Sequence, residues 1–133
     1  MAVYFRDVSI SFGDCDALGI VYYPNYFRWM DGTFHAFLHD RDQGHTVMCR
    51  ELGTLGFGLM DADLAFRSPA REGDLLRYWI EGIEWSARSF QITYRATLGD
   101  RLVLEGHERR GFFVERDGRI AAGDVGPLRD RLG

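Results

Sequence analysis

Residues 12–26 read FGDCDALGIVYYPNY and decide how the chain is expected to fold. Two aspartates, Asp14 and Asp16, lie in a short loop that leads through two tyrosines to Pro24. The fixed φ of proline and its missing N–H group suit the first position of a helix. We therefore expect a helix to begin at Pro24, with Tyr23 close to its N-cap.

The sequence after this loop has the spacing of a helix. From about residue 25 to residue 40, apolar side chains recur at intervals of three and four, which places them on one helical face. These positions are Tyr26, Met30, Thr33 or Phe34, Phe37 and Leu38, and Phe27 and Trp29 widen the face. We expect a long central helix that other structure mostly encloses.

Most of the remaining sequence is typical of β-structure. One strand is expected before the loop, at residues 8–12, and the others follow Gly53. The expected later strands are 59–66 with Leu59, Leu64 and Phe66 inward, 74–85 with a bulge at Gly82, 89–98, and 101–115 before a hairpin at Asp117-Gly118. Tight turns between successive strands predict an antiparallel meander.

The two other segments carry weaker signals. Residues 40–55 are expected to form a polar connector with a short helical piece, and the tail, residues 126–133, a surface turn. The prediction is a single α+β domain over residues 1–133, in which a curved antiparallel sheet wraps a long central helix. A single sheet leaves its edge strands exposed, so pairing between two copies of the chain is expected.

The composition of the chain excludes several classes of protein. The 133 residues suit one domain, and a hydrophobic share of 46% argues against disorder. The net charge of −4 argues against a general nucleic-acid binder, and no apolar run is long enough to span a membrane. Cys15 and Cys49 fit neither a disulfide framework nor a metal motif, so we expect a cytoplasmic protein without a signal peptide. All 16 basic residues are arginine.

The loop before the helix can support several kinds of chemistry. N–H groups at a helix start favour developing negative charge, and a nearby carboxylate can attack a polarised carbonyl or activate a water. Aspartates also cap turns with no chemical role, and that reading suits Asp14 better than Asp16. A cation held by Asp14, Asp16 and Asp31 is less favoured, because too few oxygen ligands cluster here.

The histidines offer one further pattern. Asp31, His35 and His39 share a helix face, and the two histidines have the spacing of zinc ligands. The glutamate of the H-E-x-x-H motif is missing, so a polar stripe is the favoured interpretation. His45 and His107 have no partner that the sequence reveals.

Residues 12–31, FGDCDALGIVYYPNYFRWMD, closely resemble the signature of the 4-hydroxybenzoyl-CoA thioesterases, a hot-dog fold family, in the branch shared with the YbgC-like acyl-CoA thioesterases. The resemblance continues more weakly through EWSARSF, residues 84–90. It implies a hot-dog fold in which a long helix is wrapped by a curved sheet. It also implies a homodimer that assembles into a homotetramer, with active sites at the subunit interface.

The same resemblance assigns roles to individual residues. It implies Asp16 as the catalytic carboxylate and the Tyr23 backbone N–H as the donor to the thioester carbonyl. It places Asp31 near the acyl ring, and Arg88 and Ser89 at the nucleotide phosphates of coenzyme A. Tyr23 stands where the YbgC-like branch has histidine, which favours an aroyl substrate.

The chain also departs from the family pattern. Ser86 stands where a basic residue is found in the best-known relative, so the phosphate site is expected to be weaker or to use another arginine. Leu18 is bulkier than the residue common in the aroyl-CoA enzymes, and residues 40–60 match poorly.

The expected function is therefore hydrolysis of an acyl-CoA, with an aroyl group favoured over a short-chain one. Asp16 acts as nucleophile or general base, and no metal, prosthetic group, nucleic acid or membrane is involved. Three alternatives remain open: a non-catalytic acyl-CoA-binding protein, a hydratase or dehydratase, and a metal-dependent hydrolase built on Asp31, His35 and His39.

Overall fold

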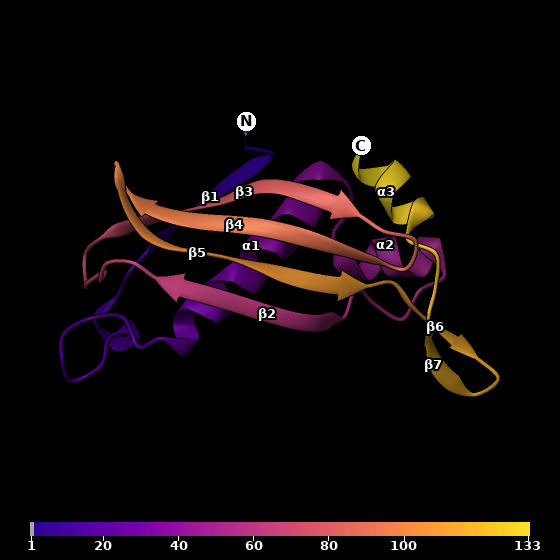
Figure 1. The fold of residues 1–133 in the computed structure, drawn as a ribbon, viewed down its shortest axis with the longest axis horizontal. Helices are drawn as coiled ribbons and strands as arrows, with labels where there is room; N and C mark the ends of the chain where they lie inside the picture. Colours follow the sequence, from indigo (N-terminus) through magenta and orange to yellow (C-terminus); the bar gives the residue numbers. More distant parts are fainter. Residues whose placement is uncertain (1) are drawn as a thin grey trace.

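The computed structural model describes residues 2–133, which form a five-stranded sheet, a separate hairpin and three α-helices (Figure 1). The sheet contains β1 (Tyr4–Ser9), β2 (Leu59–Phe66), β3 (Leu75–Trp85), β4 (Ser89–Leu98) and β5 (Arg101–Gly111). The helices are α1 (Pro24–Arg41), α2 (His45–Leu52) and α3 (Gly126–Leu132), and the hairpin pairs β6 (Phe113–Arg116) with β7 (Arg119–Ala122). The predicted α+β class is confirmed.

The strands of the main sheet are antiparallel and lie in the order β1-β3-β4-β5-β2. β3, β4 and β5 form the expected meander, and the register shift between Ile80 and Gly82 confirms the predicted bulge. A simple meander is wrong for β2, which pairs with β5 instead of β3. Residues 67–74 make the connection to β3, and this segment is too long for a tight hairpin turn.

The burial of β2 and the length of β5 also differ from expectation. Leu64 packs against the core, but Leu59 and Phe66 are 54% and 48% exposed, because β2 is an edge strand. The predicted strand over residues 101–115 ends at Gly111, and β6 turns away into the hairpin. The Phe113 ring folds back against Gly111, where an added Cβ would lie 2.8 Å from the ring, so a larger residue here would displace the ring.

Helix α1 lies across one face of the sheet and begins at Pro24 as predicted (Figure 1). Its buried face consists of Tyr26, Trp29, Met30, Thr33, Phe34, Phe37 and Leu38, which confirms the predicted spacing. The expectation of a long helix is corrected, because α1 has 18 residues. It ends at Arg41, since Asp42 leaves the helical region and Gly44 has a φ of 89°, which favours glycine.

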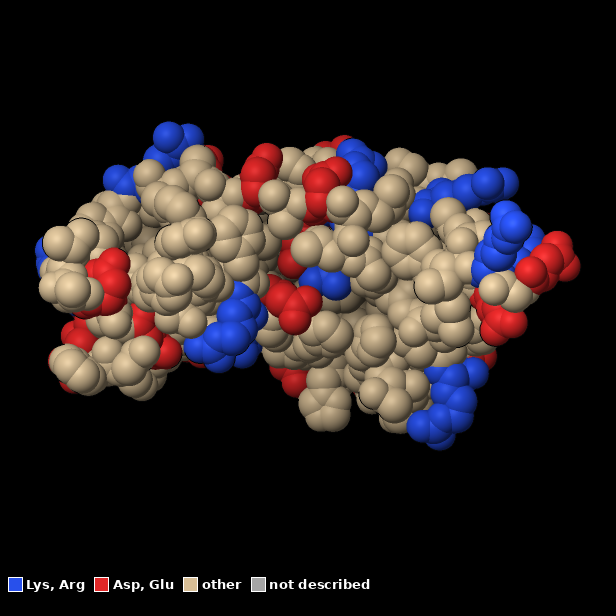
Figure 2. Space-filling view, turned by 90° about the horizontal axis from the view of Figure 1, so that it is seen from below, with Lys and Arg blue, Asp and Glu red and all other residues tan. Residues whose placement is uncertain are grey.

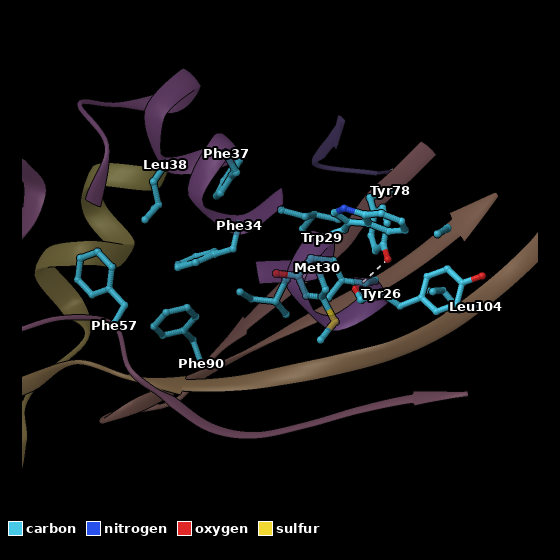
Figure 3. Close-up of a cluster of buried hydrophobic side chains, with 14 of the residues drawn as sticks. Tyr26, Trp29, Met30, Phe34, Phe37, Leu38, Phe57, Tyr78, Phe90 and Leu104 are labelled. Carbon is cyan, nitrogen blue, oxygen red and sulfur yellow. Dashed lines mark hydrogen bonds between the residues drawn. The ribbon is translucent and has the colours of Figure 1, made fainter. Parts of the chain in front are cut away.

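The core lies between α1 and the sheet (Figure 3). The rings of Phe34 and Phe90 pack with centroids 5.9 Å apart, and the Tyr78 hydroxyl donates to the Tyr26 carbonyl at 2.8 Å. The inward β4 positions Phe90, Ile92, Tyr94 and Ala96 are all buried, as their alternation predicts.

The C-terminal segment differs from the surface turn that the sequence predicts, and the structure corrects this expectation. It forms α3, whose Leu128 and Leu132 are buried, and Arg131 of this helix pairs with Asp42 at 2.6 Å. Two leucines four positions apart give the helix one apolar face, which is enough to anchor it. Within residues 2–133, no helix is both long and apolar enough to cross a bilayer.

Candidate active site

The loop before α1 folds into a small hairpin. The Asp14 carbonyl accepts a backbone hydrogen bond from Tyr22 at 2.8 Å, and the Asp16 N–H donates one to Ile20 at 2.9 Å. Gly19 supplies the positive φ of 78° that closes the turn. The strand expected at residues 8–12 instead ends at Ser9, and Phe12 begins a short 3₁₀ turn. This hairpin presents Asp16 at the surface and leads directly into the helix start.

The two aspartates of the loop have different surroundings. The Asp14 carboxylate accepts from the Ser11 N–H at 2.9 Å and lies 3.6 Å from the Arg28 guanidinium. The exposed Asp16 carboxylate accepts one hydrogen bond, from the Leu18 N–H at 2.9 Å, and its second oxygen has no partner among the described residues. Asp14 therefore stabilises the loop, while Asp16 keeps an oxygen free for another molecule.

The backbone at the helix start also keeps a free group. The Tyr23 carbonyl accepts from the Tyr26 N–H at 3.0 Å, whereas the Tyr23 N–H makes no hydrogen bond to any residue in 2–133. This donor precedes an 18-residue helix, whose dipole places partial positive charge at this end. A carbonyl oxygen placed there would be polarised.

A groove of about 430 Å³ lies beside this amide. It is lined by Ile20, Val21, Tyr23, Tyr26, Phe66, Arg67, Ser68 and Pro69. Most of the lining is apolar, and the ring of Tyr26 packs against that of Phe66 at 5.4 Å. The groove can therefore take an apolar or aromatic group next to the free N–H group.

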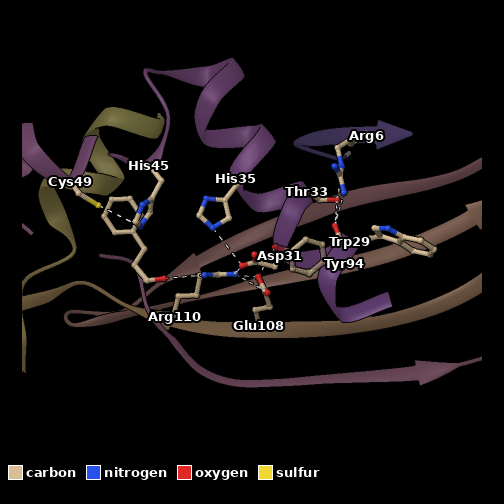
Figure 4. Close-up of polar contacts among 11 residues, drawn as sticks. Arg6, Trp29, Asp31, Thr33, His35, His45, Cys49, Tyr94, Glu108 and Arg110 are labelled. Carbon is tan, nitrogen blue, oxygen red and sulfur yellow. Dashed lines mark hydrogen bonds and ion pairs between the residues drawn. The ribbon is translucent and has the colours of Figure 1, made fainter. Parts of the chain in front are cut away.

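Asp31 belongs to a charged network under the second turn of α1 (Figure 4). Its carboxylate lies 2.7 Å from Arg110, which is also bound by Glu108 at 2.9 Å. Arg110 and Glu108 are 4% and 1% exposed, and Tyr94 donates to Glu108 at 2.7 Å. His35, 3.6 Å from Asp31, and Arg110 lower the pKa of the Asp31 carboxyl to about 2. Asp31 is thus ionised at neutral pH.

Glu108 and Arg110 are not among the residues that the sequence patterns singled out, although a signal was present. Residues of a strand that are two apart share a face, so Glu108 and Arg110 lie on the same inward face as Leu104. Two opposite charges on a buried face need each other, because an isolated buried charge is costly. The pair could have been predicted from that spacing.

The histidines do not form the zinc arrangement that their spacing permits. No group of three His, Cys, Asp or Glu side chains within residues 2–133 is placed to hold a metal ion. His35 contacts Asp31, and its ring also lies 5.1 Å from that of His45. His45 and His107, for which the sequence reveals no partner, both have one: Cys49 lies 3.5 Å from His45, and Asp61 lies 3.1 Å from His107.

Arg88 and Ser89 lie at the β3–β4 turn, at the opposite end of the sheet from the loop that holds Asp16 (Figure 1). Backbone hydrogen bonds join the loop to residues 70–74, which lie just before the start of β3. The turn that carries Arg88 lies after the end of β3, and the 11 residues of this strand span about 36 Å. Arg88 is exposed and has no hydrogen bond or ion pair with the described residues. A single chain therefore does not bring Asp16 and Arg88 together.

Comparison with known proteins identifies the family. Residues 10–122 match the thioesterase-like superfamily. The 4-hydroxybenzoyl-CoA thioesterase of Pseudomonas sp. (strain CBS-3) is 31% identical over 130 residues, covering 87% of this chain and 86% of the relative.

Two solved structures have the same fold. One is an aspartate-to-asparagine variant of 4-hydroxybenzoyl CoA thioesterase complexed with 4-hydroxybenzoyl CoA (27% identity, 98% of each chain, TM-score 0.85). The other is a gentisyl-coenzyme A thioesterase (28% identity, 95% of this chain and 99% of the other, TM-score 0.81). The antiparallel sheet packed on α1 is the hot-dog fold, and this chain belongs to the thioesterase-like superfamily.

Proposed function

We propose that this protein is an acyl-CoA thioesterase that hydrolyses an aroyl-CoA. The observation that carries the proposal is the pairing, in one loop, of a carboxylate oxygen without a partner on Asp16 and a free N–H on Tyr23. An apolar groove lined in part by Tyr23 lies at the same helix start. The relatives that act on hydroxybenzoyl-CoA and gentisyl-CoA favour an aromatic acyl group.

In the proposed reaction, the thioester carbonyl accepts a hydrogen bond from the Tyr23 N–H. The oxyanion that forms is stabilised there, and one such donor is typically worth about 3–4 kcal/mol. Asp16 attacks the carbonyl carbon or removes a proton from the attacking water. The carbon–sulfur bond then breaks, and coenzyme A leaves as a thiolate, which needs no strong general acid. Where Asp16 is the nucleophile, this leaves an aroyl–Asp16 anhydride, and water then hydrolyses it to the free acid and the Asp16 carboxylate. This chemistry requires neither a metal nor a prosthetic group.

The acyl end is proposed to involve Asp31. Its carboxylate is half exposed and ionised, and Arg110 holds it in a fixed position. Asp31 does not line the groove beside Tyr23, so an acyl ring that contacts it must extend beyond this groove along α1. Asp31 is therefore a candidate contact for the acyl ring.

A complete site is proposed to need two copies of the chain. Asp16 and Tyr23 lie at one end of the sheet and Arg88 and Ser89 at the other. A two-fold axis beside the edge strand β2 would place opposite ends of two sheets next to each other. The face seen from below carries broad uncharged areas around a small charged recess (Figure 2), and Leu59, Met60 and Phe66 of β2 are exposed.

We therefore propose a homodimer in which each site takes Asp16 and Tyr23 from one protomer and Arg88 and Ser89 from its partner. Two such dimers are proposed to form a homotetramer.

The cysteines Cys15 and Cys49 are both free thiols, which supports the cytoplasm as the compartment.

The test is thiol release from a panel of CoA thioesters: benzoyl, hydroxybenzoyl, phenylacetyl and short straight-chain. We expect turnover of the aroyl-CoA substrates, with the short straight-chain thioesters slower. Tight binding of aroyl-CoA without any thiol release would contradict the proposal and indicate a non-catalytic binding protein. Faster turnover of the straight-chain thioesters would overturn the assigned substrate class.

A further inference from the structure

The outer face of the sheet, opposite α1, carries an arginine next to Ser89. Arg109 lies on β5, and its partner in the sheet register is Gln91 on β4. Its guanidinium donates to the Ser89 hydroxyl at 3.3 Å and to the Gln91 side chain at 3.0 Å. These two contacts fix the cation beside the β3–β4 turn that carries Arg88.

The charge of Arg109 is only weakly compensated. The nearest carboxylate is Asp61, 3.9 Å from the Arg109 guanidinium. That same carboxylate lies 3.1 Å from His107, which is the closer partner. The Arg109 side chain is 37% exposed, so its remaining N–H groups can reach a ligand in solvent. By contrast, Arg110 next to it is buried and fully paired with Glu108 and Asp31.

We infer that Arg109 is a further phosphate ligand of the coenzyme A site, and that it supplies the positive charge that Ser86 does not. This inference rests on the proposed function, which places the nucleotide phosphates at Arg88 and Ser89. A guanidinium carries five N–H donors in a planar fork that suits phosphate oxygens. Arg109 uses two of them within the chain at hydrogen-bond distance.

The hydrogen bond between Arg109 and Ser89 allows both side chains to contact the same phosphate group. Ser89 Oγ accepts the hydrogen bond from Arg109, so the hydroxyl proton remains available to donate to a phosphate oxygen. A phosphate oxygen bound to that hydroxyl would lie within reach of the Arg109 guanidinium. Arg88, the preceding residue, is exposed and adds a second cation. Two arginines and one hydroxyl then bind a phosphate group at this turn.

The experiment compares two thioesters of the same aroyl group, one with coenzyme A and one with N-acetylcysteamine, which lacks the nucleotide. For Arg109→Gln, we expect the KM for aroyl-CoA to rise roughly tenfold, as for the loss of one charge-assisted hydrogen bond. Its kcat/KM for the truncated thioester should equal that of the parent. Arg109→Lys keeps the charge but loses the planar fork, so its KM for aroyl-CoA should lie between those of the parent and Arg109→Gln.

The matched control is Arg95→Gln, on the same outer face, with a side chain that is 40% exposed and paired with Glu81. It should change neither KM. An unchanged KM for aroyl-CoA in Arg109→Gln, or an equal rise for both thioesters, would overturn the inference. If the parent cleaves neither thioester, the proposed function fails separately. The inference is then decided by binding of 3′-phospho-ADP, which Arg109→Gln must weaken.

Discussion

The loop before α1 and the network under its second turn use their carboxylates in opposite ways. Asp16 is exposed and accepts one internal hydrogen bond, while Glu108 is fully buried and binds both Arg110 and Tyr94. A carboxylate whose lone pairs are all occupied by its own chain contributes to stability and cannot attack a substrate. The free oxygen on Asp16 is what makes the loop a candidate for chemistry.

The largest effect on activity is expected from Asp16→Asn. An amide cannot act as nucleophile or base, so we expect kcat for aroyl-CoA to fall about 10³-fold. The side-chain amide oxygen of this variant can still accept from the Leu18 N–H, so Tm should not change. Steady-state thiol release and thermal unfolding measure the two effects. Parent-like turnover in this variant would show that another group reacts.

Arg110→Met should instead destabilise the fold. It leaves Glu108 buried without its charge partner, and breaking one side of a buried pair typically costs about 3–5 kcal/mol. Urea unfolding measures this cost. Arg95→Met serves as the control, because its partly exposed pair with Glu81 should contribute less than about 1 kcal/mol. Equal decreases in unfolding free energy in the two variants would mean that the buried network stabilises the fold no more than a partly exposed ion pair does.

Sequence periodicity predicted some elements well and others not at all. The buried face of α1 and the alternation of β4 follow from local spacing, so both were correct. The partner of β2 depends on contacts far apart in the chain, which periodicity does not encode. The same holds for α3, whose two leucines matter only because the rest of the fold leaves room for them.

The sequence likewise predicted only part of the candidate site. The residues themselves favoured a capping role for Asp14 more than for Asp16 and placed Tyr23 at the helix start. The catalytic roles of Asp16 and Tyr23, and the phosphate-binding roles of Arg88 and Ser89, came from the resemblance to a family. The structure adds the free amide of Tyr23 and the separation of Asp16 from Arg88, because both depend on the three-dimensional arrangement of the chain.

Asp14→Ala tests whether Asp14 stabilises the loop without taking part in the reaction. This variant removes the acceptor for the Ser11 N–H, and loss of such a cap typically costs about 1 kcal/mol. We expect a lower free energy of unfolding and only a modest change in kcat. A fall in kcat as deep as that of Asp16→Asn, at a temperature where both variants are folded, would reverse the assigned roles.

The smallest expected effect is the pH-dependent contribution of Asp31 to the stability of the fold. Its pKa is lowered to about 2 in the folded state, so its ionised form stabilises the fold above about pH 4. This stabilisation is lost as pH falls through 2. Because the side chain is 53% exposed, solvent screens the pair, and we expect on the order of 1 kcal/mol.

Urea unfolding of the parent and Asp31→Asn between pH 7 and pH 2 measures this contribution. The difference in unfolding free energy should be largest at pH 7 and shrink toward pH 2. Asp130→Asn is the control, since Asp130 is exposed and lies 3.6 Å from its only partner, Arg129, in the described chain. A difference between parent and Asp31→Asn that does not vary with pH would show that His35 and Arg110 do not lower the pKa of the Asp31 carboxyl.

The most direct test is vibrational spectroscopy of a ¹³C-labelled aroyl-CoA carbonyl bound to the inactive Asp16→Asn variant. If the Tyr23 amide and the start of α1 polarise the thioester, the carbonyl stretch must move to lower wavenumber than in the free substrate. A bound carbonyl with the stretching frequency of the free thioester would contradict the assignment of this loop as the active site.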